Sequence, residues 1–255
     1  MNNSFNVFIA LLKREVLEHK NLWRVPMVLL VIAVLLRLSF SFGNLAIDYD
    51  FSQIKPLDET LDSVLDSAVF KTLAFVNFFV MVVMFLVAIF YALSCLYEER
   101  RDDSVLFWRS LPISDWMTIL SKLFIPLVVI PVVILLCQAI NALVFLGANA
   151  GEYMPYFLGF AAELTKKIVW TLLPVISWCM LCSAIVKRNP FLIAFITPIL
   201  LMLIDYLFFN GAVSDFFVIN RFTSANQFST FSLFVGVIFS LACIAIALFK
   251  RTQKI

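Results

Sequence analysis

The stretch EERRDDSVLFWRSLPISDWMTILSKL, residues 98–123, contains the densest cluster of charge in an otherwise apolar chain. It opens with six consecutive charged residues, and the apolar runs 72–96 and 117–146 flank its two ends. A bilayer crossing needs about 20 predominantly apolar residues, so both flanking runs are long enough to span a membrane. The stretch therefore predicts a polar connection that ends one membrane span and begins the next.

The composition of the whole chain supports a multi-span membrane protein. Of its 255 residues, 63% are hydrophobic and 14% are charged, whereas soluble domains carry roughly 25% charged residues. Four further apolar runs bring the number of predicted spans to six. These four runs cover residues 25–42, 168–186, 191–209 and 231–249. Pro126 and Pro131 predict a kink in the third span, because proline removes a backbone donor. We expect an all-α polytopic membrane protein with one transmembrane domain over residues 1–255.

The positions of lysine and arginine predict the orientation of the spans. Basic residues cluster before the first span, between the second and third, between the fourth and fifth, and after the sixth. By the positive-inside rule, both termini and these loops are predicted to be cytosolic. We expect the first apolar run to be retained, because acids as well as bases precede it, unlike in a signal peptide. A compact chain of this kind suggests a bacterial inner membrane.

Three segments outside the spans carry their own patterns. In residues 1–24, apolar side chains recur at helical spacing, and charged residues such as Glu15 occupy the other, polar faces. This pattern predicts an amphipathic helix on the inner membrane surface. Residues 43–71 are acidic and contain an apolar helical face, which indicates a short outer helix. Residues 148–167 combine interface aromatics with charges, and we expect a re-entrant or interfacial outer helix there.

The chain lacks the residues that most enzyme sites require. Its single histidine, His19, lies in the leader, where we interpret it as a polar-face residue, and its cysteines lie in apolar stretches. Cys179 and Cys182 form a CxxC without a second pair or a nearby histidine, so we interpret them as packing residues. No G-x-x-x-x-G-K-[ST] occurs, and no basic stripe with interleaved aromatics suggests nucleic acid. We expect no catalytic residue, no metal and no cofactor bound by this chain.

Two charges are predicted to lie at membrane depth, where charge is costly and usually functional. Arg37 lies about twelve residues into the first span and Asp205 about fourteen into the fifth. At 1.5 Å per residue, their heights are about 18 Å and about 21 Å from the cytosolic edge. An interhelical or inter-subunit ion pair is therefore one hypothesis. Separate snorkelling of each side chain is the other.

The connection between the second and third spans has the features of a docking element. Residues 104–110 can form about two turns of helix that Leu111-Pro112 ends, and Ser114 can cap the third span. Within this segment, aromatic and aliphatic side chains combine with arginine, as in many interface anchors. An ordinary interfacial turn with its aromatics among lipid headgroups remains the alternative.

Three short motifs carry a resemblance to a known family. Glu98-Glu99-Arg100 at the end of a span, Leu111-Pro112-Ile113-Ser114 and Ser121-Lys122-Leu123 together resemble the pattern of type-2 ATP-binding-cassette (ABC-2) exporter permeases. The layout of leader helix, six spans and cytosolic termini is similar along nearly the whole chain. One departure is that the family usually places an outer re-entrant piece after the fifth span, whereas the bulkier outer segment here is 148–167.

The resemblance implies a half-transporter: two copies of this chain, as a homodimer or heterodimer in membrane lipid, with two copies of a separate P-loop ATPase that binds ATP and Mg. The resemblance also implies that residues 97–116 form a cytosolic coupling loop with a short coupling helix. The residues implied to contact the ATPase lie between 98 and 112. They are Glu98, Glu99, Arg100, Arg101, Val105, Leu106, Phe107, Trp108, Arg109, Leu111 and Pro112. The sparse polar groups of the spans favour a hydrophobic or amphipathic cargo.

Two other functions compete with an exporter permease. An ATPase-coupled subunit could do mechanical or regulatory work in a cell-envelope complex, with its dimer interior sealed by interlocked side chains. A membrane-embedded enzyme is the third candidate, and the missing histidine and acid constellations argue against it.

Overall fold

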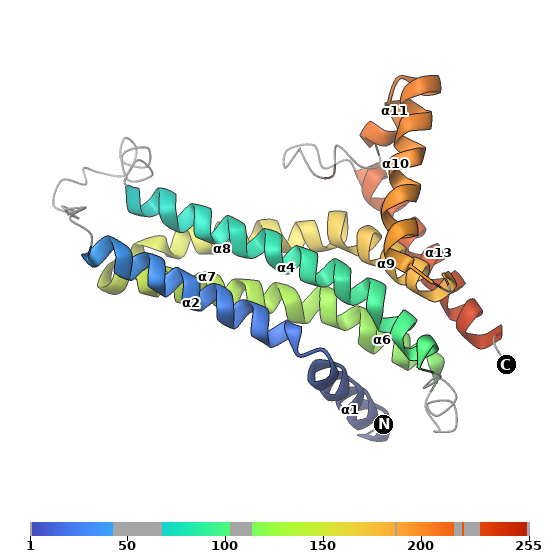
Figure 1. Cartoon of the computed structure of the whole chain (residues 1–255), viewed down its shortest axis with the longest axis horizontal. Helices are drawn as coiled ribbons and strands as arrows, with labels where there is room; N and C mark the ends of the chain where they lie inside the picture. Colours follow the sequence, from blue (N-terminus) through green and yellow to red (C-terminus); the bar gives the residue numbers. More distant parts are fainter. Residues whose placement is uncertain are drawn as a thin grey trace. The chain divides into compact units, whose positions relative to one another are not determined.

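The structure, a computed structural model, describes residues 2–42, 68–102, 114–186, 188–216, 221 and 230–253. All regular secondary structure in these residues is helical (Figure 1). Six of these helices are long and apolar enough to cross a membrane. They are Asn21–Ser39, Val69–Arg101, Asp115–Leu146, Met154–Ile185, Pro190–Phe209 and Thr230–Arg251. The six spans predicted from the sequence are confirmed as such helices, as expected of an integral membrane protein.

The leader is a separate helix, but it is shorter than predicted. Helix α1 covers Asn2–Glu18, and α2 covers Asn21–Phe42, so the first span begins four residues before the predicted start at residue 25. The Lys20 carbonyl accepts from the amides of Trp23 and Arg24 at 3.2 and 3.1 Å, which starts the new helix. Arg24 therefore lies in the first turn of α2. The helix can begin before this residue because a first turn tolerates a charge that the apolar interior of a span does not.

The chain forms two compact units, and three helical paths contribute residues to both. Unit 1 holds residues 1–19, 87–129 and 163–255; unit 2 holds residues 20–86 and 130–162. Helix α4 (Ala68–Arg101) contributes to both units. So does the path formed by α6 (Asp115–Phe124), the π-helical turn η2 (Ile125–Val129) and α7 (Ile130–Leu146). The third is α8 (Met154–Lys167), the π-helical turn η4 (Ile168–Leu172) and α9 (Leu173–Ile185).

Unit 2 has an apolar core with a small polar chain of side chains beside it. Its core residues are Ala33, Val69, Phe70, Leu73, Val76, Phe145 and Leu146. The Asn141 amide donates to Asn77 Oδ1 at 3.0 Å, and Asn77 Nδ2 donates to the Tyr153 hydroxyl at 3.0 Å. Hydrogen bonds of this kind hold membrane helices together where apolar surface gives no driving force for association. They link α4, α7 and the 3-10 helix η3 (Gly147–Tyr153).

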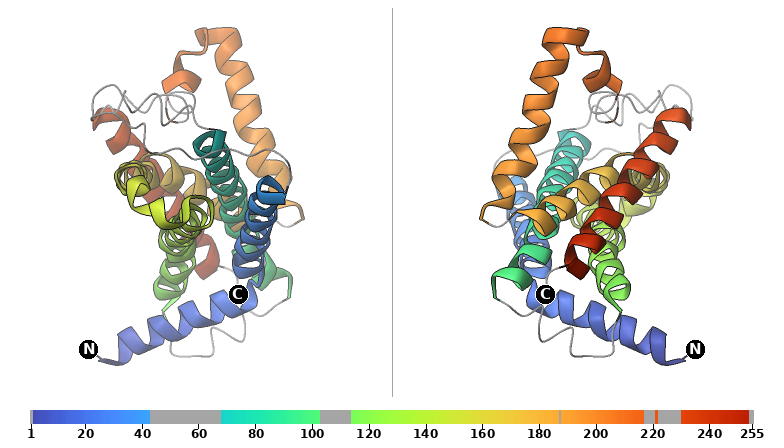
Figure 2. Two further views of the ribbon diagram at one scale, coloured as in Figure 1. Left: turned by 90° about the vertical axis from the view of Figure 1, so that its left-hand side faces the viewer. Right: turned by 90° about the vertical axis from the view of Figure 1, so that its right-hand side faces the viewer.

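Unit 1 contains the remaining elements, among them α10 (Pro190–Phe209), α11 (Ala212–Ser214) and α13 (Thr230–Gln253). Helix α9 packs along α13, and α1 packs across α6 (Figure 2). Ser114 caps α6 as predicted, since its Oγ accepts from the Met117 amide at 3.4 Å. Phe8 of α1 makes an edge contact with Phe124 of α6, with ring centroids 5.8 Å apart. These contacts hold the leader helix against the start of the third span.

The structure describes only part of the two outer segments that were predicted from the sequence. A helix does cover Met154–Lys167, but it continues through η4 into α9, so no turn separates it from the fourth span. Its location at a membrane surface stays a prediction. Of the segment 43–71, residues 43–67 lie outside the described residues, and residues 68–71 form the first turn of α4. In the third span, η2 lies between α6 and α7 and contains Pro126, and Pro131 is the second residue of α7.

Candidate functional site, a buried ion-pair network

Six charged side chains from four helices of unit 1 meet in one cluster, which we call the ion-pair network. Three are acids and three are bases, so their formal charges balance. The members are Arg14 and Glu15 of α1, Glu99 of α4, Asp115 and Lys122 of α6, and Arg251 of α13.

Lys122 lies at the centre of the ion-pair network. Its side chain is 1% exposed, and its Nζ lies 2.7 Å from Glu15 Oε1 and 3.2 Å from Glu99 Oε1. An ammonium removed from water is tolerated only when carboxylates and hydrogen bonds replace its hydration. Lys122 therefore holds the leader helix and the end of the second span against the third span.

Glu99 joins three further charges to this centre. Arg14 Nη2 donates to its Oε1 at 3.2 Å, and Arg251 Nη1 lies 3.3 Å from its Oε2. Arg251 also donates through Nε to Asp115 Oδ1 at 3.0 Å. Through these bonds the last turn of α13 is tied to the end of α4 and to the first turn of α6.

Glu15 has two aromatic neighbours in addition to Lys122. The Tyr91 hydroxyl donates to Glu15 Oε2 at 2.9 Å, and His19 Nε2 lies 3.8 Å from the same oxygen. The His19 ring makes an edge contact with Tyr91, with centroids 4.7 Å apart. Burial lowers the pKa of His19 below its ordinary value, although the Glu15 carboxylate acts in the opposite direction. The lone histidine, predicted to be a polar-face residue, lies against the network.

The residues of the first motif have distinct surroundings. Glu99 belongs to the ion-pair network, while Arg100 donates to the carbonyls of Ser183 and, at 2.7 Å, Val186 at the end of α9. A cation there satisfies carbonyls that have no partner within the helix. Glu98 is exposed. Arg101 is also exposed, and its Nε donates to Asp102 at 3.1 Å.

The other predicted contact residues are outside the part of the chain that the structure describes. These are Val105, Leu106, Phe107, Trp108, Arg109, Leu111 and Pro112. The described chain stops at Asp102 and resumes at Ser114. The ion-pair network therefore involves residues on both sides of this segment, Glu99 before it and Asp115 and Lys122 after it.

Asp205 has local partners. Its Oδ2 accepts from the Ser214 hydroxyl at 2.5 Å and the Ser214 amide at 2.6 Å, and its Oδ1 accepts from the Val213 amide at 3.3 Å. The carboxylate thus caps the short helix α11, which follows the turn at the end of α10. Arg37 belongs to unit 2, so the ion pair between Arg37 and Asp205 stays a prediction.

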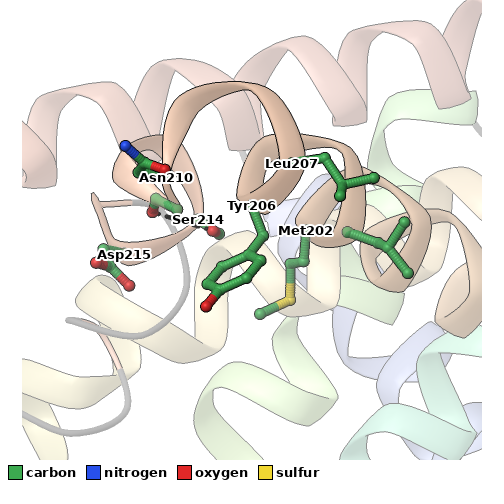
Figure 3. Close-up of a pocket in the computed structure, with 8 residues that line it drawn as sticks. Met202, Tyr206, Leu207, Asn210, Ser214 and Asp215 are labelled. Carbon is green, nitrogen blue, oxygen red and sulfur yellow. Dashed lines mark hydrogen bonds between the residues drawn. The ribbon is translucent and has the colours of Figure 1, made fainter.

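A partly open pocket of about 620 Å³ lies along the end of α10 and the turn to α11 (Figure 3). Asn210 and Gly211 make this turn with φ of +52° and +80°, a conformation that suits asparagine and glycine. Met202, Tyr206 and Leu207 line the pocket from α10, beside Ser214 and Asp215 at its other end. The α10 side of the pocket is therefore apolar and aromatic, whereas its other end carries the polar groups.

Nothing in the described residues provides a metal centre. They include no group of three or more His, Cys, Asp and Glu side chains arranged to hold a metal ion. All five cysteines are buried free thiols, and for Cys179 and Cys182 this agrees with their interpretation as packing residues. Among the described residues, the ion-pair network is thus the most extensive polar arrangement.

Most members of the ion-pair network were not predicted from the sequence. Glu15 was assigned to a polar face of the leader, whereas it is 1% exposed and faces Lys122. Lys122 was recognised only as part of a motif, and Arg251 only as a cytosolic base. One signal was available: a lysine inside an apolar run needs an anion nearby.

Comparison with known proteins adds no family to this geometry. No protein-family model, curated protein or solved structure matches the chain.

Proposed function

We propose that this chain is the permease subunit of an ATP-binding-cassette exporter, driven by a separate P-loop ATPase. The observation that carries the proposal is the ion-pair network on both sides of residues 103–113. Two of its members, Glu99 and Lys122, belong to the motifs that resemble this family. The proposal therefore rests on motif residues that are far apart in the sequence and in contact in the structure.

The network supports the proposal because it can transmit force. A displacement of residues 103–113 acts on the end of α4 and the start of α6, since these helices border the segment. Lys122 and Glu99 connect both helices to α1, and Arg251 connects them to α13. Buried ion pairs resist separation, because breaking one leaves a charge without a partner at a cost of about 3–5 kcal/mol. A push by an ATPase would then move four helix ends together.

The partners and cargo follow from the same proposal. ATP and Mg bind to the ATPase partner, because the chain has no phosphate-binding motif of its own. A second copy of the chain completes the path; the largely apolar side chains of α10 support this, since few of them are buried within the chain. The apolar spans favour a hydrophobic or amphipathic cargo. The assembly is placed in a bacterial inner membrane with both termini cytosolic.

Affinity capture of the tagged chain in mild detergent tests the proposal. The wild type is expected to retain a P-loop ATPase, and the triple mutant Phe107→Ala, Trp108→Ala, Arg109→Ala is expected to lose it. A matched control replaces exposed residues of α8 by alanine: Met154, Leu158 and Lys166. Absence of any ATPase from a folded wild-type dimer would contradict the proposal.

A structure of the captured complex separates the exporter from the mechanical or regulatory subunit. An exporter requires a continuous central path between the two copies. A mechanical subunit is expected to close that space with interlocked phenylalanine and leucine side chains.

A further inference from the structure

Arg221 is a buried cation held by backbone carbonyls. Its side chain is 7% exposed; Nη1 donates to the Trp170 carbonyl at 2.6 Å, and Nη2 donates to the Ser232 carbonyl at 2.7 Å and to Ser232 Oγ at 3.3 Å. No carboxylate of the described residues acts on its charge, and residues 216–229 contain no Asp or Glu. Burial lowers the pKa of Arg221. A buried charge without an ionic partner is costly, so we interpret Arg221 by the backbone groups that its guanidinium connects.

The Trp170 carbonyl is available to Arg221 because of a proline. Pro174, four residues later in the same helical path, has no N–H to donate to that carbonyl. The π-helical turn η4 accommodates this defect in the ladder. A further hydrogen bond runs in the opposite direction: the Thr171 hydroxyl donates to the Arg221 carbonyl at 3.0 Å. The guanidinium also lies 5.3 Å from the centre of the Trp170 ring, within range of a cation–π contact.

Helix α13 is shaped to receive the same guanidinium. Gly236 lies one turn after Ser232, and a Cβ placed on it would be 2.5 Å from Arg221 Nη1 and 2.6 Å from Nη2. Contacts this short force one of the groups to move. Pro174 lacks an N–H donor in one helix, and Gly236 lacks a side chain in another. Both features accommodate the side chain of Arg221.

We infer that Arg221 is a positioning residue that joins η4, in the middle of the fourth span, to the first turns of the sixth span as one rigid pair. Its planar fork donates to one carbonyl on each helix, which no other side chain can do at the same spacing. The joint does not depend on the proposed transport function. If the chain is an exporter permease as proposed, α9 and α13 move together as a pair. Opening of the transport path at the Arg221 end of this pair then does not separate the two helices.

A double-mutant cycle between Arg221 and Gly236 tests the joint without any partner or cargo. In the wild type, Gly236→Ala is expected to lower the ratio of folded to unfolded protein about tenfold or more, because of overpacking against the guanidinium. In an Arg221→Met background, the same change is expected to have less than about a threefold effect. Gly159→Ala is the control, because a Cβ there meets open space. An equal loss from Gly236→Ala in both backgrounds would overturn the inference.

A distance measurement separates positioning from general stability. Spin labels at Val169 and Phe231, both exposed, report on the Arg221 end of the helix pair. Labels at Ile185 and Ile246 report on the other end. In a cysteine-free background, Arg221→Lys is expected to broaden only the first distance distribution, because an ammonium lacks the fork. If the first distribution keeps its width, the joint is wrong; Arg221→Lys also serves in the cycle should Arg221→Met not fold.

Discussion

Replacing Lys122 by methionine removes the central charge of the ion-pair network and keeps an unbranched side chain that is one heavy atom shorter. The ammonium contacts Glu15 at 2.7 Å and Glu99 at 3.2 Å. Glu99 keeps Arg14 and Arg251 after the change, at 3.2 and 3.3 Å. Glu15 keeps only the Tyr91 hydroxyl and the more distant His19 among these contacts. The cost is therefore expected to arise mainly from Glu15.

The size of this cost follows from the burial of Glu15. Removing one partner of a buried ion pair costs about 3–5 kcal/mol, because the remaining charge is left without compensation. That range corresponds to at least a hundredfold fall in the ratio of folded to unfolded protein. In the double mutant Lys122→Met, Glu15→Gln, the stranded charge is absent. The double mutant is therefore expected to be more stable than Lys122→Met alone, with a coupling of about 1–3 kcal/mol.

Chemical unfolding in detergent, followed by tryptophan fluorescence, measures these differences. Lys13→Met is the matched control: it removes the same group from an exposed position of α1 and is expected to change stability by less than about 0.5 kcal/mol. The reasoning is refuted if Lys122→Met costs no more than Lys13→Met. It is also refuted if adding Glu15→Gln makes Lys122→Met less stable.

Three further predictions concern other charged groups. Because the pKa of His19 is lowered on folding, stability should fall as the pH drops below about 6.5, and His19→Gln should remove that part of the pH dependence in unfolding titrations. A pH dependence unchanged in the variant would contradict this. Arg100→Met should speed amide hydrogen exchange in residues 183–186, where α9 loses its carbonyl partner; unchanged protection would argue against that role. If Arg37 and Asp205 form an ion pair, Arg37→Ala and Asp205→Asn should destabilise less together than the sum of their separate effects, whereas additive losses would exclude the pair.

Features set by neighbouring residues were predictable from the sequence. A span is a run of about 20 apolar residues, and a cap depends on a hydroxyl a few residues from an amide, so the six spans and Ser114 were found. The start of α2 was placed four residues late, because Arg24 is tolerated in a first turn. Asp205 suggested a distant counter-ion, yet Ser214 lies nine residues away and meets it after the chain reverses at Gly211.

The ion-pair network was not predictable in the same way. Glu15 and Lys122 are separated by 107 positions, and no local pattern indicates which acid meets which base. The amphipathic pattern of α1 even placed Glu15 on a polar face, because a periodicity distinguishes apolar from polar residues but not solvent from a buried ion pair. Arg221 posed the same difficulty: its acceptors are backbone carbonyls, which every sequence contains.

The π-helical turn η2 indicates where the chain can lose a residue without a change in the faces of its helices. A turn of this kind holds one residue more than an α-helical turn, so Ile125–Val129 acts as an absorbed insertion in the third span. Deleting one residue there should restore an ordinary helix and leave Lys122 and Asn141 on their present faces. The same deletion in the middle of α4 would rotate Glu99 about 100° relative to Asn77, because each helical residue turns the chain by that amount. Length variation in this chain should therefore be tolerated at 125–129 and excluded between residues 77 and 99.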